Sequence, residues 1–113
     1  ECEEEIQQVE RDLGIRILRW ADLDLMNDFS GVAALMKNLD LVISISSAVV
    51  PLAGAVGAPT LCMTYQNWVL LGGKNTYPWF PSVTPVALSY SDAMAAALPQ
   101  IKERLKGLMK VRV

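Results

Sequence analysis

One stretch in the middle of the chain constrains the fold more than any other. A nearly continuous apolar run at 41–45 is followed by two hydroxyl residues, Ser46 and Ser47, and then by small residues to about Val56. A Gly-Ala-Pro sequence ends this segment, and a second apolar run occupies 60–64. Such runs suit parallel strands that are buried on both faces. The pattern predicts a strand–helix–strand unit, and phosphates and nucleotides bind at the first turn of such units in α/β proteins.

Weaker signals on either side extend this unit into a domain. Apolar spacing and turn residues predict further helices at 3–13, 29–39 and 67–71 and beyond 92, and further strands at 15–18 and 86–88. Strands that alternate with helices predict a parallel sheet with helices on both faces. We therefore expect a three-layer α/β/α sandwich, which is a Rossmann-like fold.

Helix ends are marked by short polar residues, glycine or proline. The first helix is expected to end at Gly14. The expected caps are Asn27 or Asp28 before the second helix, Ser46 or Ser47 before the third, and Ser91 or Asp92 before the last. Within the last helix, Pro99 predicts a kink or two abutting helices.

Composition limits the class of protein. The 113 residues fit one domain, 1–113, and a chain that begins with Glu is expected to be part of a longer protein. A net charge of −2 argues against nucleic-acid binding, and no uninterrupted apolar run reaches the roughly 18 residues of a membrane-spanning helix. Cys62 is expected to be a buried free thiol, which favours a reducing, cytoplasmic location.

Two separated motifs carry a resemblance to a known family. The segment Asp40–Pro59 resembles the donor-site segment of heptosyltransferase-like glycosyltransferases, including its Leu-Ala-Gly sequence and its Gly-x-Pro stop. The segments 67–72 and 77–82 resemble the Trp-rich loop of the same family, which ends in Pro-Trp-Tyr-Pro. The similarity extends from about Gly14 to Ser82. Relatives of this type often form the C-terminal part of tetratricopeptide-repeat proteins.

The resemblance implies a fold and a set of site residues. It implies the C-terminal, nucleotide-sugar-binding domain of a two-domain GT-B enzyme, with the N-terminal domain as its partner. Ser46, Ser47 and Ala48 would hold the donor diphosphate through hydroxyl and backbone N–H groups. The segment after the first expected strand would line the nucleotide base; it comprises Asp22, Leu23, Asp24, Leu25 and Met26. The sequence contains no metal-ligand cluster, so we expect no metal or other cofactor.

The chain departs from the family pattern at two positions. The family histidine falls on Pro51, and the chain contains no histidine. The acidic residue of the family's Asp-Thr pair is Ser46. A histidine there could donate a hydrogen bond to the leaving diphosphate as its negative charge develops. No catalytic residue can therefore be named, and we expect this chain to be inactive by itself.

Each of these residues also has a purely structural interpretation. Ser46 and Ser47 can serve as helix caps, and Pro51 suits the first turn of a helix. The aromatic residues Trp68, Trp79 and Phe80 can stack on a base or a sugar, but such residues more often close a small core beneath a loop. Two functions follow. The first is a nucleotide-diphosphate-sugar-binding module of a glycosyltransferase-like protein, and the alternative is a degenerate, non-catalytic domain used for scaffolding or protein interaction.

Overall fold

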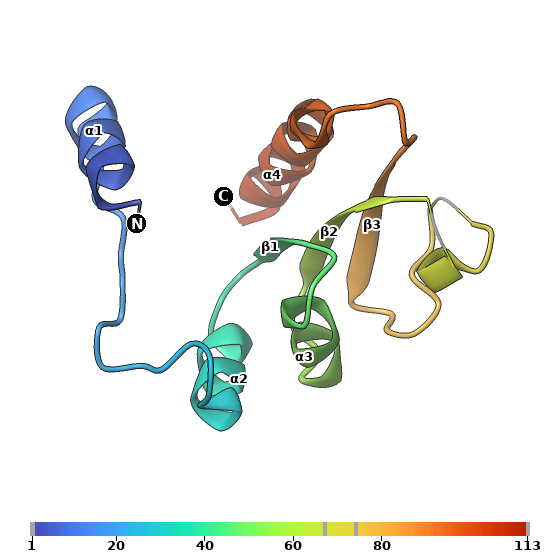
Figure 1. Cartoon of the computed structure of the whole chain (residues 1–113), viewed down its shortest axis with the longest axis horizontal. Coiled ribbons are helices and arrows are strands. Elements are labelled where there is room, and N and C mark those ends of the chain that lie inside the picture. The colour runs from blue at the N-terminus through green and yellow to red at the C-terminus, as the bar shows by residue number, and fades with distance from the viewer. Residues whose placement is uncertain (1, 67, 74, 113) are drawn as a thin grey trace.

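The computed structural model describes residues 2–66, 68–73 and 75–112. Its element order is α1 (Glu3–Leu13), α2 (Phe29–Lys37), β1 (Val42–Ile45), α3 (Val49–Ala55), β2 (Thr60–Tyr65), a 3₁₀ turn η1 (Trp68–Leu70), β3 (Val83–Leu88), a second 3₁₀ turn η2 (Met94–Ala97) and α4 (Leu98–Arg112). The three strands form one parallel sheet in the order β1-β2-β3 (Figure 1). The predicted α/β fold with a parallel sheet is confirmed.

Each strand points its side chains alternately to the two faces of the sheet, and helices pack on both faces. On one face, α2 and α3 bury Met36 and Ala53 against Val42. The opposite face meets η2 and α4, where Ile101 packs with Leu61 and Val86. Figure 1 shows α2 and α3 on one side of the sheet and α4 on the other. The central strand β2 is buried along most of its length, as its continuous apolar sequence predicts.

The expected strand at 15–18 is not formed in this structure, which differs from the prediction. These residues are extended but exposed, and among the described residues they pair with no other strand. The N–H of Ile17 instead donates to a carboxylate oxygen of Glu10, 2.9 Å away. A strand needs a neighbour to satisfy its backbone, and α1 with this segment stands apart from the sheet in Figure 1.

Several helix boundaries are confirmed. The carboxylate of Asp28 accepts a hydrogen bond from the N–H of Gly31 at 2.9 Å and caps α2, as predicted. Gly14 ends α1 in the left-handed conformation, with φ 64°. The two abutting helices expected near Pro99 are η2 and α4, and the proline lies in the first turn of α4, where its missing N–H costs no intrahelical bond.

Two cap predictions are wrong. The residue before α3 is Ala48, which has no capping side chain, and Ser47 lies one residue earlier. The residue before η2 is Ala93, which has no capping side chain. The carboxylate of Asp92 does not cap the helix; it accepts hydrogen bonds from the N–H and the hydroxyl of Ser89 at 3.1 and 2.9 Å.

Three lengths also differ from expectation. The second helix ends at Lys37, two residues early, and β3 begins at Val83 instead of 86. The short helix expected at 67–71 is a 3₁₀ turn at Trp68–Leu70, and position 67 lies outside the described residues.

Candidate functional site

The turn after β1 lies at the carboxyl edge of the sheet. The N–H of Ser46 donates to the carbonyl of Met63 at 3.1 Å and so continues the ladder to β2. The hydroxyl of Ser47 lies 3.4 Å from both the hydroxyl of Ser44 and the N–H of Val49. Ser46, Ser47 and Ala48 are all exposed. The turn therefore presents two hydroxyl groups to solvent at the place where ligands of α/β proteins bind.

Only part of this turn can offer backbone N–H groups to a ligand. The N–H of Ser46 is used by Met63, and that of Val50 donates to the carbonyl of Ser47 at 3.1 Å. For the N–H groups of Ser47 and Ala48, no acceptor is recorded among the described residues. The helix that follows has seven residues, so its dipole adds little. A ligand here would be held by two hydroxyls and two N–H groups.

The Trp-rich loop closes over the same edge. The indole N–H of Trp79 donates to the carbonyl of Val69 at 2.8 Å, which ties the loop to η1. The rings of Tyr77 and Phe80 stack with their centroids 6.4 Å apart. Phe80 also lies directly on Gly54 of α3, so closely that a methyl group at that glycine would sit 2.4 Å from the ring. The loop is thus anchored to the helix that follows the Ser46–Ser47 turn.

A cavity of about 470 Å³ joins the turn to the loop. It is lined by both hydroxyl residues, the helix proline and the loop aromatics: Ser46, Ser47, Pro51, Trp68, Val69, Tyr77, Trp79 and Phe80. We call this the serine–tryptophan cavity. Its volume falls within the range of small-molecule pockets, and its lining is mostly apolar with a few polar groups, which is typical of such pockets.

The aromatic residues of this cavity differ in burial. Phe80 packs against the buried cluster that contains Val50 and Cys62, so for this ring the core-closing interpretation is confirmed. Trp68 is 76% exposed and Trp79 is 51% exposed, so neither closes a core. Two large rings that face solvent beside a cavity are available for stacking.

The chemistry of the lining is that of binding. None of the described residues that line it is a carboxylate, a lysine or an arginine, and the ionisable group among them is the phenol of Tyr77. Burial and the neighbouring Cys62 thiol raise the pKa of that phenol, so it stays neutral at physiological pH. Pro51 lies in the first turn of α3, as its structural interpretation predicts. In the described part of the chain, no cluster of side chains could hold a metal ion.

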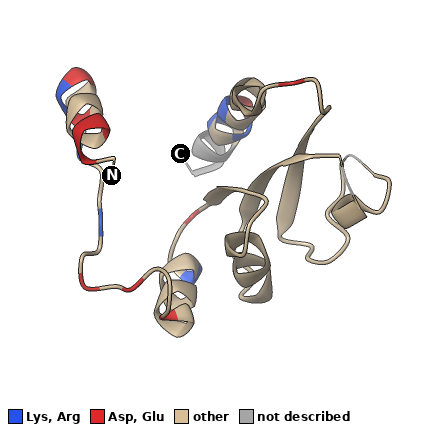
Figure 2. Ribbon diagram, in the orientation of Figure 1, with Lys and Arg blue, Asp and Glu red and all other residues tan. Residues whose placement is uncertain are grey.

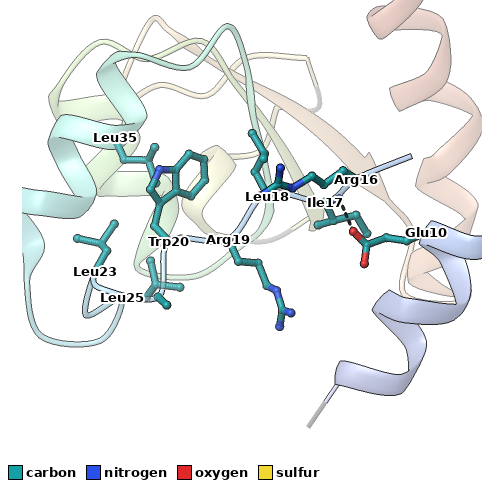
Figure 3. Close-up of a pocket in the computed structure, with 10 residues that line it drawn as sticks. Glu10, Arg16, Ile17, Leu18, Arg19, Trp20, Leu23, Leu25 and Leu35 are labelled. Carbon is teal, nitrogen blue, oxygen red and sulfur yellow. Dashed lines mark hydrogen bonds between the residues drawn. The ribbon is translucent and has the colours of Figure 1, made fainter. Parts of the chain in front are cut away.

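The residues expected to line a nucleotide base lie elsewhere. Asp24 forms a local turn in which one carboxylate oxygen accepts the N–H groups of Met26 and Asn27 at 3.0 and 3.1 Å, and the Asn27 amide bonds the other. These hydrogen bonds, that of the Asn27 amide first, lower the pKa of the Asp24 carboxyl. Leu23 and Leu25 line a separate cavity of about 880 Å³ between 16–21 and α2 (Figure 3). The serine–tryptophan cavity does not include any residue of 22–26, so the two expected halves of the donor site do not share one cavity.

Sequence reasoning missed two residues of the cavity, Val69 and Tyr77. The carbonyl of Val69 accepts a hydrogen bond from the indole N–H of Trp79. A backbone acceptor of this kind cannot be recognised from the pattern of side chains. Tyr77 belongs to the 77–82 segment, but its residue type alone indicates no role in binding. The signal for Tyr77 is its position directly before Pro78, because a proline restricts the backbone conformation of the residue that precedes it.

Comparison with known proteins gives one relative. Protein FlbA of Caulobacter vibrioides is 45% identical to this chain over 84 residues, which is 74% of this chain. The matched segment is 14% of FlbA, so this chain spans a small part of that protein. No family model matches the chain, and no solved structure matches it. Among the described residues, no helix has the length and apolar character required to cross a bilayer.

Proposed function

We propose that this chain is the nucleotide-diphosphate-sugar-binding module of a glycosyltransferase-like protein, the C-terminal half of a GT-B fold. The observation that carries the proposal is the serine–tryptophan cavity. The two motifs that resemble the family are separated in the sequence, yet they line one cavity at the carboxyl edge of a parallel sheet. That edge is where nucleotides bind in open α/β sheets.

The proposed roles follow from the chemistry of each group. The hydroxyls of Ser46 and Ser47, with the N–H groups of Ser47 and Ala48, donate to diphosphate oxygens. Trp68 and Trp79 offer ring faces to the sugar or the base, because both are exposed beside the cavity. Asp22, Leu23, Asp24, Leu25 and Met26 would contribute only in a larger assembly, since they lie outside this cavity.

Binding without transfer is the consequence of the lining. A sugar transfer needs a base for the acceptor and stabilisation of the leaving diphosphate. Among the described lining residues there is no carboxylate or cation, and Pro51 stands where the family has a histidine. We therefore assign binding to this chain, and any base to the N-terminal partner domain of the full-length protein. The two unpaired cysteines support a reducing, cytoplasmic location.

The same lining favours one second candidate, a non-catalytic domain for scaffolding or protein interaction. Its specific support is Pro51, which replaces a polar side chain with an apolar one inside the cavity. A scaffold of this kind would bind no nucleotide, so ligand binding separates the two functions.

Tryptophan fluorescence tests the proposal with a built-in reference. The chain has three tryptophans, of which Trp68 and Trp79 line the cavity and Trp20 lines the other one. A Trp20→Phe variant reports the cavity alone, and a Trp68→Phe, Trp79→Phe double variant reports the reference site. Saturable quenching by ADP, GDP or UDP sugars in the first variant and not in the second is the expected result. Linear quenching of equal slope in both would reject the binding function and leave scaffolding.

A further inference from the structure

The two edges of the sheet are built differently. The backbone N–H groups of Thr60 and Gln66 donate to the carbonyls of Ser82 and Leu88. In this parallel register, the peptide groups of the alternate residues of β3, including Pro85, point away from β2. Pro85 has no N–H, and a proline on an edge strand blocks the addition of another strand. Pro85 therefore prevents a further strand from pairing with the β3 edge.

The β1 edge carries no such protection. Val42 and Ser46 donate to carbonyls of the β2 side, so the peptide groups of Ile43 and Ile45 face outward. The Ser44 hydroxyl bonds the Ile45 carbonyl at 2.8 Å, but no strand pairs with this edge among the described residues. An edge strand with two outward isoleucine peptides is a template for another strand.

One face of β1 is also uncovered. Ile43 is 41% exposed and Ile45 is 52% exposed, on the face that α4 covers elsewhere. The side chains from η2 and α4 reach Leu61, Val86 and Leu88 of β2 and β3, which leaves β1 bare. Within the described part of the chain, no strand lies beside β1 and no helix covers this face of it.

The N-terminal segment has the two elements that are missing. Residues 2–19, which we call the arm, consist of α1, a glycine turn and the extended segment 15–18. The guanidinium of Arg19 binds both carboxylate oxygens of Glu3 at 2.6 and 2.7 Å, and the N–H of Ile17 donates to Glu10. These contacts join helix and extended segment into one unit. No residue of α1 is buried, and Val9 and Leu13 lie exposed.

The topology selects the β1 edge as the place of this segment. The helix that follows the arm, α2, packs beside α3 on one face of the sheet, where Val32 and Met36 meet Ala53. A strand–helix–parallel strand connection is right-handed in nearly all proteins. Since α3 connects β1 to β2 across the same face, a strand that precedes α2 falls beside β1, on the side away from β2.

The charges of the helices agree with this placement. In α1, five acidic residues stand against one arginine, and residues 98–107 of α4 contain three basic residues and one glutamate. Figure 2 shows the acidic start of α1 and basic residues in the described part of α4. Two helices of opposite charge attract one another within a Debye length, about 8–10 Å at physiological salt.

We propose that the arm closes onto β1 of its own chain. Segment 15–18 adds to the sheet as a fourth parallel strand, through the backbone groups of Arg16 and Leu18, and α1 covers Ile43 and Ile45 beside α4. The Ile17–Glu10 bond remains on the outer side and protects the new edge. Closure removes the cavity of about 880 Å³ between the arm segment and α2, which Trp20, Leu23 and Leu35 line in Figure 3. This inference is independent of the nucleotide site.

Amide hydrogen exchange of the full 113-residue chain, followed by NMR, tests the closure. Light scattering on the same sample establishes that it is monomeric. The expected result is exchange at Arg16 and Leu18 that is slower than in an unstructured peptide by roughly tenfold or more. An Ile43→Asp variant should lose this protection, because a carboxylate blocks the apolar contact with α1. The matched control is Leu71→Asp, which places the same charge on an exposed leucine away from β1.

Three results would overturn the proposal. They are peptide-like exchange at 16 and 18 in the monomer, protection that appears only as a dimer forms, and protection that survives Ile43→Asp. Unchanged exchange at the β2 amides of each variant shows that the fold is intact, so a loss at the arm alone reports the arm.

Discussion

Gly54 allows the closest approach in the candidate site, and replacing it makes a quantitative test of the packing. A Cβ atom built on Gly54 lies 2.4 Å from Cγ of Phe80 and 2.8 Å from its Cβ. The second contact is next to the Phe80 backbone, so rotation of the ring cannot relieve it. Insertion of a methyl group into such a contact costs about 1–3 kcal/mol. Alanine in place of glycine in a helix returns about 0.5–1 kcal/mol.

Gly107 of α4 provides the matched control. A Cβ atom built there meets nothing within 4 Å, so Gly107→Ala gains the helical preference without a steric cost. We expect Gly107→Ala to raise the free energy of unfolding by about 0.5–1 kcal/mol. Gly54→Ala should lower it, and the difference between the two variants should equal the steric cost of about 1–3 kcal/mol.

Urea denaturation of the wild type and both variants supplies the free energies, and equal slopes show that the unfolded states are comparable. If Gly54→Ala stabilises the chain as much as Gly107→Ala, Phe80 does not rest on α3. The anchoring of the loop that forms the cavity would then be wrong.

Two further predictions concern the titratable groups. Burial raises the pKa of the Cys62 thiol to about 11. A thiol reagent at neutral pH should therefore modify the exposed Cys2 in the native chain and reach Cys62 only after unfolding. Modification of both cysteines in the native state would contradict the buried core around β2. The hydrogen bond and charge of Arg19 lower the pKa of the Glu3 carboxyl, so the Glu3–Arg19 contact should be complete above the ordinary glutamate pKa and be lost as the pH falls through the lowered one. An NMR titration of Glu3 with an ordinary midpoint, equal to that in an Arg19→Gln variant, would show that the contact is absent in solution.

The buried centre of the fold could be predicted from the sequence because its signals are local. The run at 60–64 is buried along most of its length, as its apolar sequence predicts, and Asp28 and Gly14 are specific caps. The run at 41–45 was expected to be buried on both faces as well, but Ile43 and Ile45 are exposed, because no described element covers that face of β1. The strand at 15–18 could not be settled in this way. Its residues have strand character, but a strand exists only with a partner, and pairing across the chain leaves no local mark.

The candidate site was predictable in part. The sequence motifs brought Ser46, Ser47 and the Trp-rich loop to one ligand, and the structure places them around one cavity. The burial of each ring could not be predicted, because aromatic identity is the same for half-buried Phe80 and exposed Trp68. Likewise, the choice of cap before α3 was one residue off, since adjacent serines give the same signal.

An amide-resolved NMR titration with ADP, GDP and UDP, alone and as sugar conjugates, tests the central claim most directly. The account predicts saturable shifts at 46–50 and in the loop around Trp68 and Trp79, with a preference for one base. It also predicts weaker binding and unchanged stability for Ser47→Ala. The absence of shifts at millimolar ligand, both in this chain and in the full-length protein, would contradict a nucleotide-sugar site.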